Sequence, residues 1–103
     1  MFVARIAMKV QARHRGAFRE YVLSEVRVAR ELDGCVEYAF CEDLSDPARV
    51  LLYEEWATRD AFDAYRASAL FATAGARLRP LLEGAPNSAY YESDDVFSSC
   101  AAR

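Results

Sequence analysis

The sequence predicts an α+β fold in which a four-stranded antiparallel sheet carries helices on one face. Segments whose apolar residues recur at every second position are separated by segments whose apolar residues recur every three or four positions. Turn residues such as Asp-Gly and Asp-Pro stand between them. The resulting order, β-α-β-β-α-α-β, suits the ferredoxin-like arrangement.

The first strand is expected over residues 2–10, where apolar side chains alternate along the chain. A helix is expected from about Arg15 to Leu32, because the apolar spacing there changes to three and four. Asp33 and Gly34 end this helix, since glycine readily adopts the left-handed conformation that closes a helix. The strongly apolar face of the first strand, residues 2–10, is formed by Phe2, Ala4, Ile6, Met8 and Val10.

An antiparallel hairpin is expected next. Residues 35–42 alternate again, and the alternation predicts that Val36, Tyr38 and Phe40 share one face. Residues 43–47 contain Asp, Ser and Pro and are expected to form a turn. Residues 49–56 then form the third strand, since a short loop between two such segments favours a hairpin.

Two short helices and a fourth strand complete the domain. Thr58 and Ser68 are typical N-cap residues, and each is expected to begin a helix. Residues 88–93 are expected to form the last strand. We expect one α+β domain over residues 1–93 and a C-terminal tail over residues 94–103 that adds little to the core, because it is mostly small and polar.

Composition excludes several classes of protein. Thirteen Lys and Arg residues against sixteen Asp and Glu residues give a net charge of −3, which argues against general binding to nucleic acid. No apolar run is long enough to span a membrane. Arg5 and Lys9 interrupt the apolar N-terminal stretch, so we do not expect a signal peptide.

The cysteines and the single histidine predict no metal site. Cys35, Cys41 and Cys100 are odd in number and form no C-x-x-C pair, and His14 is far from all three in sequence. Free thiols favour a cytoplasmic setting. His14 lies between Arg13 and Arg15 without apolar periodicity and is expected to be exposed to solvent.

Both faces of the predicted strands carry apolar residues, although helices can cover only one. Val3 and Ala7 lie opposite Ile6 and Met8 in the first strand. A bare apolar face is unusual on a monomer, and a second copy packed sheet against sheet would cover it. We therefore expect a homodimer, the alternative being a monomer with scattered surface aromatics.

Several short motifs resemble the antibiotic biosynthesis monooxygenase family. They include Asp33 to Tyr38, the E-x-W formed by Glu54 and Trp56, the following Ala61-Phe62, and Ser68 to Phe71. The resemblance covers about residues 2–93 and implies a small dimeric α+β barrel. Many members carry histidines where this chain has Tyr65 and Leu70, which argues against the histidine-dependent versions of the chemistry.

The resemblance also implies an activity. The family's oxygenases use dioxygen on phenolic, anthrone or quinol substrates without flavin, heme or metal. A deprotonated phenol or hydroquinone can itself reduce dioxygen, so the protein needs only to hold the ring, remove a proton and stabilise the oxyanion. We expect a cofactor-independent monooxygenase whose ligands are a small aromatic molecule and dioxygen.

A pocket between the helices and the sheet is expected to hold the substrate. Glu54 is the candidate base and Tyr65 the candidate proton relay or hydrogen-bond donor. Each has a structural alternative: Glu54 could pair with an arginine such as Arg5, and Tyr65 could be a half-buried helix residue. The candidate substrate-binding walls are aromatic: Trp56, Tyr38, Phe62 and Phe71. Trp56 is equally compatible with a core role, and residues such as the other three are more often simply part of the core.

Two other functions remain open from the sequence. The same dimeric barrel could be a non-redox binding or regulatory module for a small aromatic molecule, or an isomerase of a small metabolite. An arginine-rich, polar pocket would favour the isomerase, whereas an aromatic lining favours the oxygenase or the binding module.

Overall fold

Four strands form one antiparallel sheet in the order β2-β3-β1-β4 in the computed structural model, which describes residues 1–94. The strands are β1 (Phe2–Lys9), β2 (Cys35–Asp43), β3 (Asp46–Trp56) and β4 (Asn87–Glu92). The predicted tail beyond Asp94, with Cys100, lies outside the described residues.

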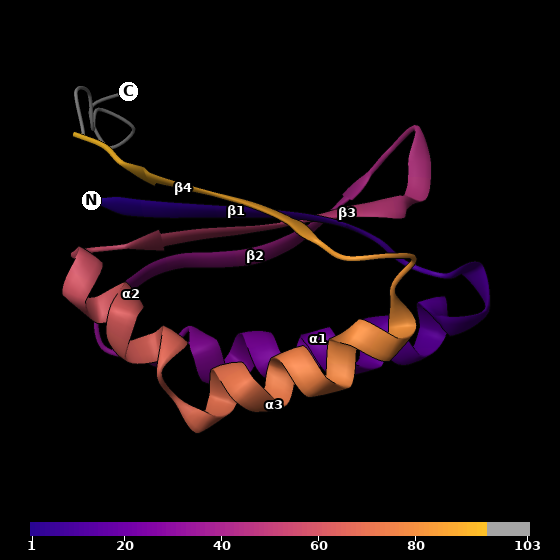
Figure 1. Ribbon diagram of the computed structural model, residues 1–103, viewed down its shortest axis with the longest axis horizontal. Helices are drawn as coiled ribbons and strands as arrows, with labels where there is room; N and C mark the ends of the chain where they lie inside the picture. Colours follow the sequence, from indigo (N-terminus) through magenta and orange to yellow (C-terminus); the bar gives the residue numbers. More distant parts are fainter. Residues whose placement is uncertain (95–103) are drawn as a thin grey trace.

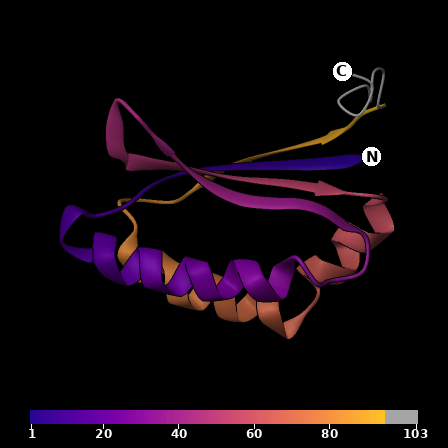
Figure 2. The ribbon, with the colours of Figure 1, turned by 180° about the vertical axis from the view of Figure 1, so that it is seen from behind.

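Three helices lie on one face of this sheet (Figures 1 and 2). They are α1 (Arg15–Ala29), α2 (Arg59–Arg66) and α3 (Ala69–Leu78), and short 3-10 turns, η1 (Ala12–His14) and η2 (Arg79–Leu81), stand beside α1 and α3. The element order and the strand order are those of the ferredoxin-like fold, which confirms the α+β prediction.

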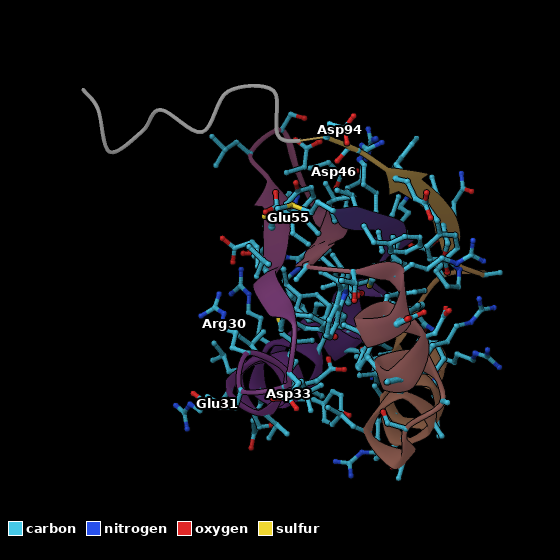
Figure 3. The ribbon with its side chains drawn as sticks, turned by 90° about the vertical axis from the view of Figure 1, so that its left-hand side faces the viewer. Arg30, Glu31, Asp33, Asp46, Glu55 and Asp94 are labelled. Carbon is cyan, nitrogen blue, oxygen red and sulfur yellow. The ribbon has the colours of Figure 1, made fainter. Side chains whose placement is uncertain are left out.

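The hydrophobic core fills the layer between the sheet and the helices. The inward side chains of β1 are those that the alternation predicts, and Phe2, Ala4 and Met8 are all buried. Opposite them β3 contributes Val50, Leu52, Glu54 and Trp56. Figure 3 shows the side chains that fill this layer. Two of these four β3 positions carry a polar atom into the core, which prepares the site described below.

The helices begin where the sequence predicts. Thr58 Oγ1 accepts a hydrogen bond from the backbone N–H of Ala61 at 3.1 Å. Ser68 Oγ accepts one from the N–H of Phe71 at 3.2 Å. These caps satisfy backbone donors in the first turn of each helix and so fix where α2 and α3 start.

Helix α1 ends earlier than the apolar spacing suggests, at Ala29 rather than Leu32. Residues 30–32 continue as a turn, in which the N–H of Leu32 bonds to the carbonyl of Ala29 at 3.1 Å. Gly34 then adopts a φ of +78°, the left-handed conformation predicted for it. The apolar spacing runs on because Leu32 still packs against the core from the turn.

A bulge at the start of β2 overturns one prediction about its faces. Cys35 pairs with Trp56 and Glu37 pairs with Glu55, so Val36 is an extra residue in β2. Val36 is 53% exposed instead of sharing the core face with Tyr38. Regular alternation cannot foresee such an inserted residue.

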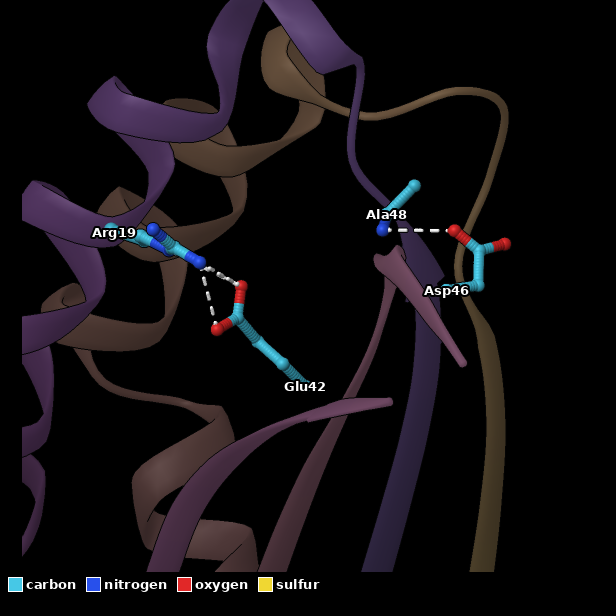
Figure 4. Close-up of polar contacts among 4 residues, drawn as sticks. All are labelled: Arg19, Glu42, Asp46 and Ala48. Atoms are coloured by element: carbon cyan, nitrogen blue, oxygen red, sulfur yellow. Dashed lines mark hydrogen bonds and ion pairs between the residues drawn. The ribbon is translucent and has the colours of Figure 1, made fainter. Parts of the chain in front are cut away.

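The hairpin turn is shorter than predicted, because β3 begins at Asp46 and pairing extends to Asp43 opposite Asp46. The Asp43 carboxylate accepts a hydrogen bond from the N–H of Ser45 at 2.7 Å. The Asp46 carboxylate accepts one from the N–H of Ala48 at 3.1 Å, which Figure 4 shows. Near the same end of the sheet, Arg19 of α1 forms an ion pair with Glu42 at 2.8 Å (Figure 4).

No helix among the described residues covers the other face of the sheet (Figures 1 and 2). Its larger apolar side chains include Val3, Leu51, Tyr53 and Tyr91, and the smaller Ala39 shares this face by register. Tyr91 is 47% exposed and the others are half-buried. Within the same part of the chain, no helix is long and apolar enough to cross a membrane.

Candidate functional site

A cavity of about 250 Å³ lies between the sheet and the helices. Its lining comes from all four strands and from α1, α2, α3 and η2, so it occupies the position expected for the pocket. Five aromatic rings contribute to the lining: Tyr38, Phe62, Tyr65, Phe71 and Tyr90. Two carboxyl groups, those of Glu25 and Glu54, also reach it.

Glu54 reaches the cavity from β3 and is only 2% exposed. Its Oε1 accepts a hydrogen bond from the indole N–H of Trp56 at 2.8 Å, because residues two apart on a strand share a face. Burial raises the pKa of Glu54 to about 7, and the hydrogen bond from Trp56 only partly offsets this effect. Arg5 is not its partner, since Arg5 pairs in register with Tyr53 on the opposite face.

Glu25 is a second buried carboxyl group, which the sequence reasoning missed. It lies on α1, is 3% exposed, and accepts a hydrogen bond from the hydroxyl of Tyr38 at 3.2 Å through Oε1. Its Oε2 is buried without a hydrogen-bond partner. Burial raises the pKa of Glu25 to about 7 despite that hydrogen bond.

A signal for Glu25 was present in the sequence. Phe18, Val22 and Ala29 are all buried on α1, and position 25 falls between them at spacings of three and four residues. A charged residue within the apolar face of a helix is uncommon unless it has a partner or a function. A helix face defined by its apolar residues alone leaves Glu25 out, although Glu25 occupies a position on that face.

The two tyrosines join these groups into a chain of hydrogen bonds. The hydroxyl oxygens of Tyr38 and Tyr65 are 2.9 Å apart. Because Tyr38 has one hydroxyl proton and donates it to Glu25, Tyr65 is the donor to Tyr38. Burial raises the pKa of both phenols, so they keep their protons at neutral pH. The hydroxyl of Tyr65 retains lone pairs for a ligand.

Trp56 does not line the cavity. It is fully buried and stacks on Tyr65 with ring centroids 4.9 Å apart and an interplanar angle of 22°. The structure therefore places Trp56 behind the ring of Tyr65 and beside the carboxyl of Glu54, where it supports both groups without facing the cavity. Parity along the strand predicted the shared face but not which residue would lie in front.

The remaining candidate walls lie at different depths. Phe62 is buried, and its ring stacks on that of Phe2 with the ring centroids 4.6 Å apart. Phe71 is 39% exposed and meets Tyr65 edge-on at 5.5 Å, so it stands where the cavity opens. The ring centroid of Tyr90, on β4, lies 5.5 Å from that of Phe62, and Tyr90 also lines the cavity.

The sequence reasoning also missed Arg79 and Ser88, which lie on η2 and β4 and line the cavity. Both are exposed. Arg79 is the lone basic residue of the lining drawn from residues 1–94. The C-terminal third of the chain carries no motif that would have pointed to them.

No metal site is evident in the described part of the chain, where no three His, Cys, Asp or Glu residues lie together in a way that could hold an ion. His14 was predicted to be exposed, but it is half-buried at the end of η1. It does not line the cavity. The polar groups that line the cavity are carboxyl, phenol and hydroxyl groups and the guanidinium of Arg79.

Comparison with known proteins places the chain among one family. A family model described as antibiotic biosynthesis monooxygenase matches residues 1–77. No curated protein matches the chain.

Solved structures share its fold. A candidate antibiotic biosynthesis monooxygenase from Deinococcus radiodurans superposes with a TM-score of 0.87 at 24% identity, covering 95% of this chain and 97% of that one. The protein Rv0793 from Mycobacterium tuberculosis gives 0.83 at 25% identity, covering 95% and 100%. A candidate monooxygenase of the same description from Nitrosomonas europaea gives 0.84 at 20% identity, covering 90% and 98%.

Proposed function

Because this chain belongs to the antibiotic biosynthesis monooxygenase family, we propose that it is a cofactor-independent monooxygenase that oxidises a small hydroxylated aromatic molecule with dioxygen. The observation that carries the proposal is Glu54, a buried carboxyl group with a pKa raised to about 7 in an aromatic cavity. A base with a pKa near the working pH is well suited to take a proton from a phenol.

The size of the cavity supports a small ring system. An apolar cavity of about 150 Å³ holds benzene, whereas this one has about 250 Å³. One or two fused rings fit such a space better than the three rings of an anthrone. A hydroquinone with one or two rings is therefore the substrate class that we propose.

The reaction balances without an added reductant. A hydroquinone and one O₂ give a hydroxyquinone and one H₂O, and the four electrons come from the substrate. Glu54 takes a hydroxyl proton, the electron-rich ring reduces O₂ and forms a C–O bond, and Glu54 returns the proton to the ring peroxide. The distal hydroxyl of the resulting hydroperoxide then leaves with the ring hydrogen as water, and the hydroxyl of Tyr65 accepts a hydrogen bond from the hydroxyl that the ring retains.

The lining argues against the isomerase alternative, because its basic residue is the exposed Arg79 and most of its surface is apolar or aromatic. The binding module differs from the oxygenase only in lacking turnover. Cys35 and Cys41 are free thiols among the described residues, which supports a reducing, cytoplasmic setting for either function. We further propose a homodimer joined through the uncovered sheet face.

Oxygen uptake tests the proposal. Purified protein treated with a chelator is mixed with a panel of one- and two-ring hydroquinones, and dioxygen consumption above the protein-free rate is measured. We expect uptake with at least one member, and a loss of about 100-fold or more in Glu54→Gln, which keeps the shape of the side chain but removes the base. Binding of the panel without oxygen uptake would favour the binding module instead.

A further inference from the structure

The carboxyl group of Glu25 has one oxygen that nothing in the described chain satisfies. Glu25 Oε1 is held by Tyr38, but Oε2 is buried without a partner while the side chain lines the cavity. A buried carboxyl oxygen without a hydrogen bond costs free energy. A group that enters the cavity is well placed to remove that cost.

We propose that Glu25 is a second substrate-binding carboxyl group, and that its Oε2 takes the hydrogen bond of a hydroxyl on the aromatic ring. The inference rests on the proposed function only in that the ring occupies this same cavity. It adds a residue on α1 to the groups that act on the substrate in the proposed function, Glu54 on β3 and Tyr65 on α2, so the ring would be held between two carboxyl groups from opposite layers.

The surroundings of Glu25 specify the chemistry of the group it meets. The described residues offer no ion pair to Glu25, and Tyr38 already donates to Oε1. An ionised carboxylate only accepts hydrogen bonds, whereas a protonated one donates from the oxygen that Tyr38 leaves free. A ring hydroxyl both donates and accepts, so it can pair with either state, whereas an ether can pair only with the protonated one.

The proposal is tested by binding, separately from turnover. Three probes, dialysed under nitrogen to prevent oxidation, differ in one group: 2-naphthol donates and accepts a hydrogen bond, 2-methoxynaphthalene only accepts, and naphthalene does neither. Their dissociation constants are measured by equilibrium dialysis at pH 8, where Glu25 is mainly ionised. We expect 2-naphthol to bind about 10-fold more tightly than 2-methoxynaphthalene, the range of one hydrogen bond to a charged acceptor.

Glu25→Gln provides the decisive variant. Its amide oxygen can keep the hydrogen bond from Tyr38, and its amide N–H₂ then faces the cavity in place of Oε2. This variant should therefore bind 2-naphthol and 2-methoxynaphthalene about equally tightly. Glu20→Gln is the matched control, because Glu20 is an exposed glutamate on the same helix, and it should keep the wild-type preference.

Three results would overturn the proposal: equal binding of the three probes to the wild type, an unchanged preference in Glu25→Gln, or no binding of any probe. The wild-type comparison stands even if the variant does not fold. A Glu25-dependent preference without oxygen uptake on any hydroquinone would contradict the proposed monooxygenase activity and support the role of Glu25. Oxygen uptake with an unaltered preference in Glu25→Gln would support the activity and contradict the role of Glu25.

Discussion

Burial from bulk water sets the chemistry of Glu54 more than any neighbouring charge does. Its pKa is raised from 4.5 to about 7, and the negative charge of Glu25 contributes to the rise. Two carboxyl groups that influence one another titrate as a pair, so the apparent pKa belongs to both. The pair can hold or release a proton near neutral pH, as a base for phenols requires.

The rate of the proposed reaction should therefore depend on pH in a definite direction. Because the base is active when it is ionised, kcat/KM is expected to rise as the pH passes through about 7 and to level off above it. The measurement is a pH profile of initial oxygen uptake. A rate that falls over this range would contradict the assignment of Glu54 as the base.

Tyr65 offers a second test at the scale of the residue. Its hydroxyl joins Tyr38, and its ring stacks on Trp56. Tyr65→Phe keeps the ring but removes the hydroxyl, so turnover should fall by about 10- to 1000-fold while the fold remains. Tyr21→Phe is the control, since Tyr21 is a half-buried tyrosine outside the cavity lining. Equal activity of Tyr65→Phe and the wild type would show that Tyr65 only packs.

At the scale of the element, local chemistry was predictable and irregular pairing was not. Thr58 and Ser68 cap their helices because an N-cap depends on only a few neighbouring residues. The exposure of Val36 depends on where β2 pairs with β3, which is a tertiary matter. The same distinction applies to the site. The alternation of side chains along β3 predicts that Glu54 and Trp56 share one face. The packing of α1 and α2 against the sheet, which the sequence does not reveal, puts Glu25 in the cavity lining and leaves Trp56 outside it.

The connection between α1 and β2 depends on Gly34. Both Gly34 and Gly84 have positive φ angles, but a Cβ at Gly34 would lie 2.5 Å from Cβ of Ala61, whereas nothing lies within 4 Å at Gly84. Gly84→Ala should cost about 1 kcal/mol from backbone strain alone. Gly34→Ala adds a clash with α2 and should cost about 2 to 4 kcal/mol. Denaturant unfolding measures both, and equal losses would contradict the close approach of Gly34 to α2.

At the scale of the whole molecule, the uncovered face of the sheet is the surface through which we propose that the homodimer forms. Val3, Leu51 and Tyr53 lie there beyond the reach of any described helix. A dimer that packs this face against its copy would remove the apolar surface from water. Light scattering should return a mass of about 23 kDa, twice the chain mass of 11.6 kDa.

A matched pair of variants tests which face forms the dimer. Leu51→Lys places a charge on the uncovered face and should give a monomer, because an unpaired charge is costly in a dry interface. Leu23→Lys makes the same change on α1, where Leu23 is 63% exposed, and should leave the dimer intact. A wild-type monomer at micromolar concentration, or a dimer that survives Leu51→Lys, would contradict this arrangement.

The fate of the two atoms of dioxygen tests the proposed monooxygenase most directly. The chelated protein is supplied with ¹⁸O₂ and the hydroquinone that supports uptake, and the product is analysed by mass spectrometry. The proposed reaction predicts one ¹⁸O atom in the hydroxyquinone and the other in water, with formation dependent on Glu54. An unlabelled quinone accompanied by hydrogen peroxide would contradict the proposed reaction. A labelled product that forms as fast in Glu54→Gln as in the wild type would also contradict it.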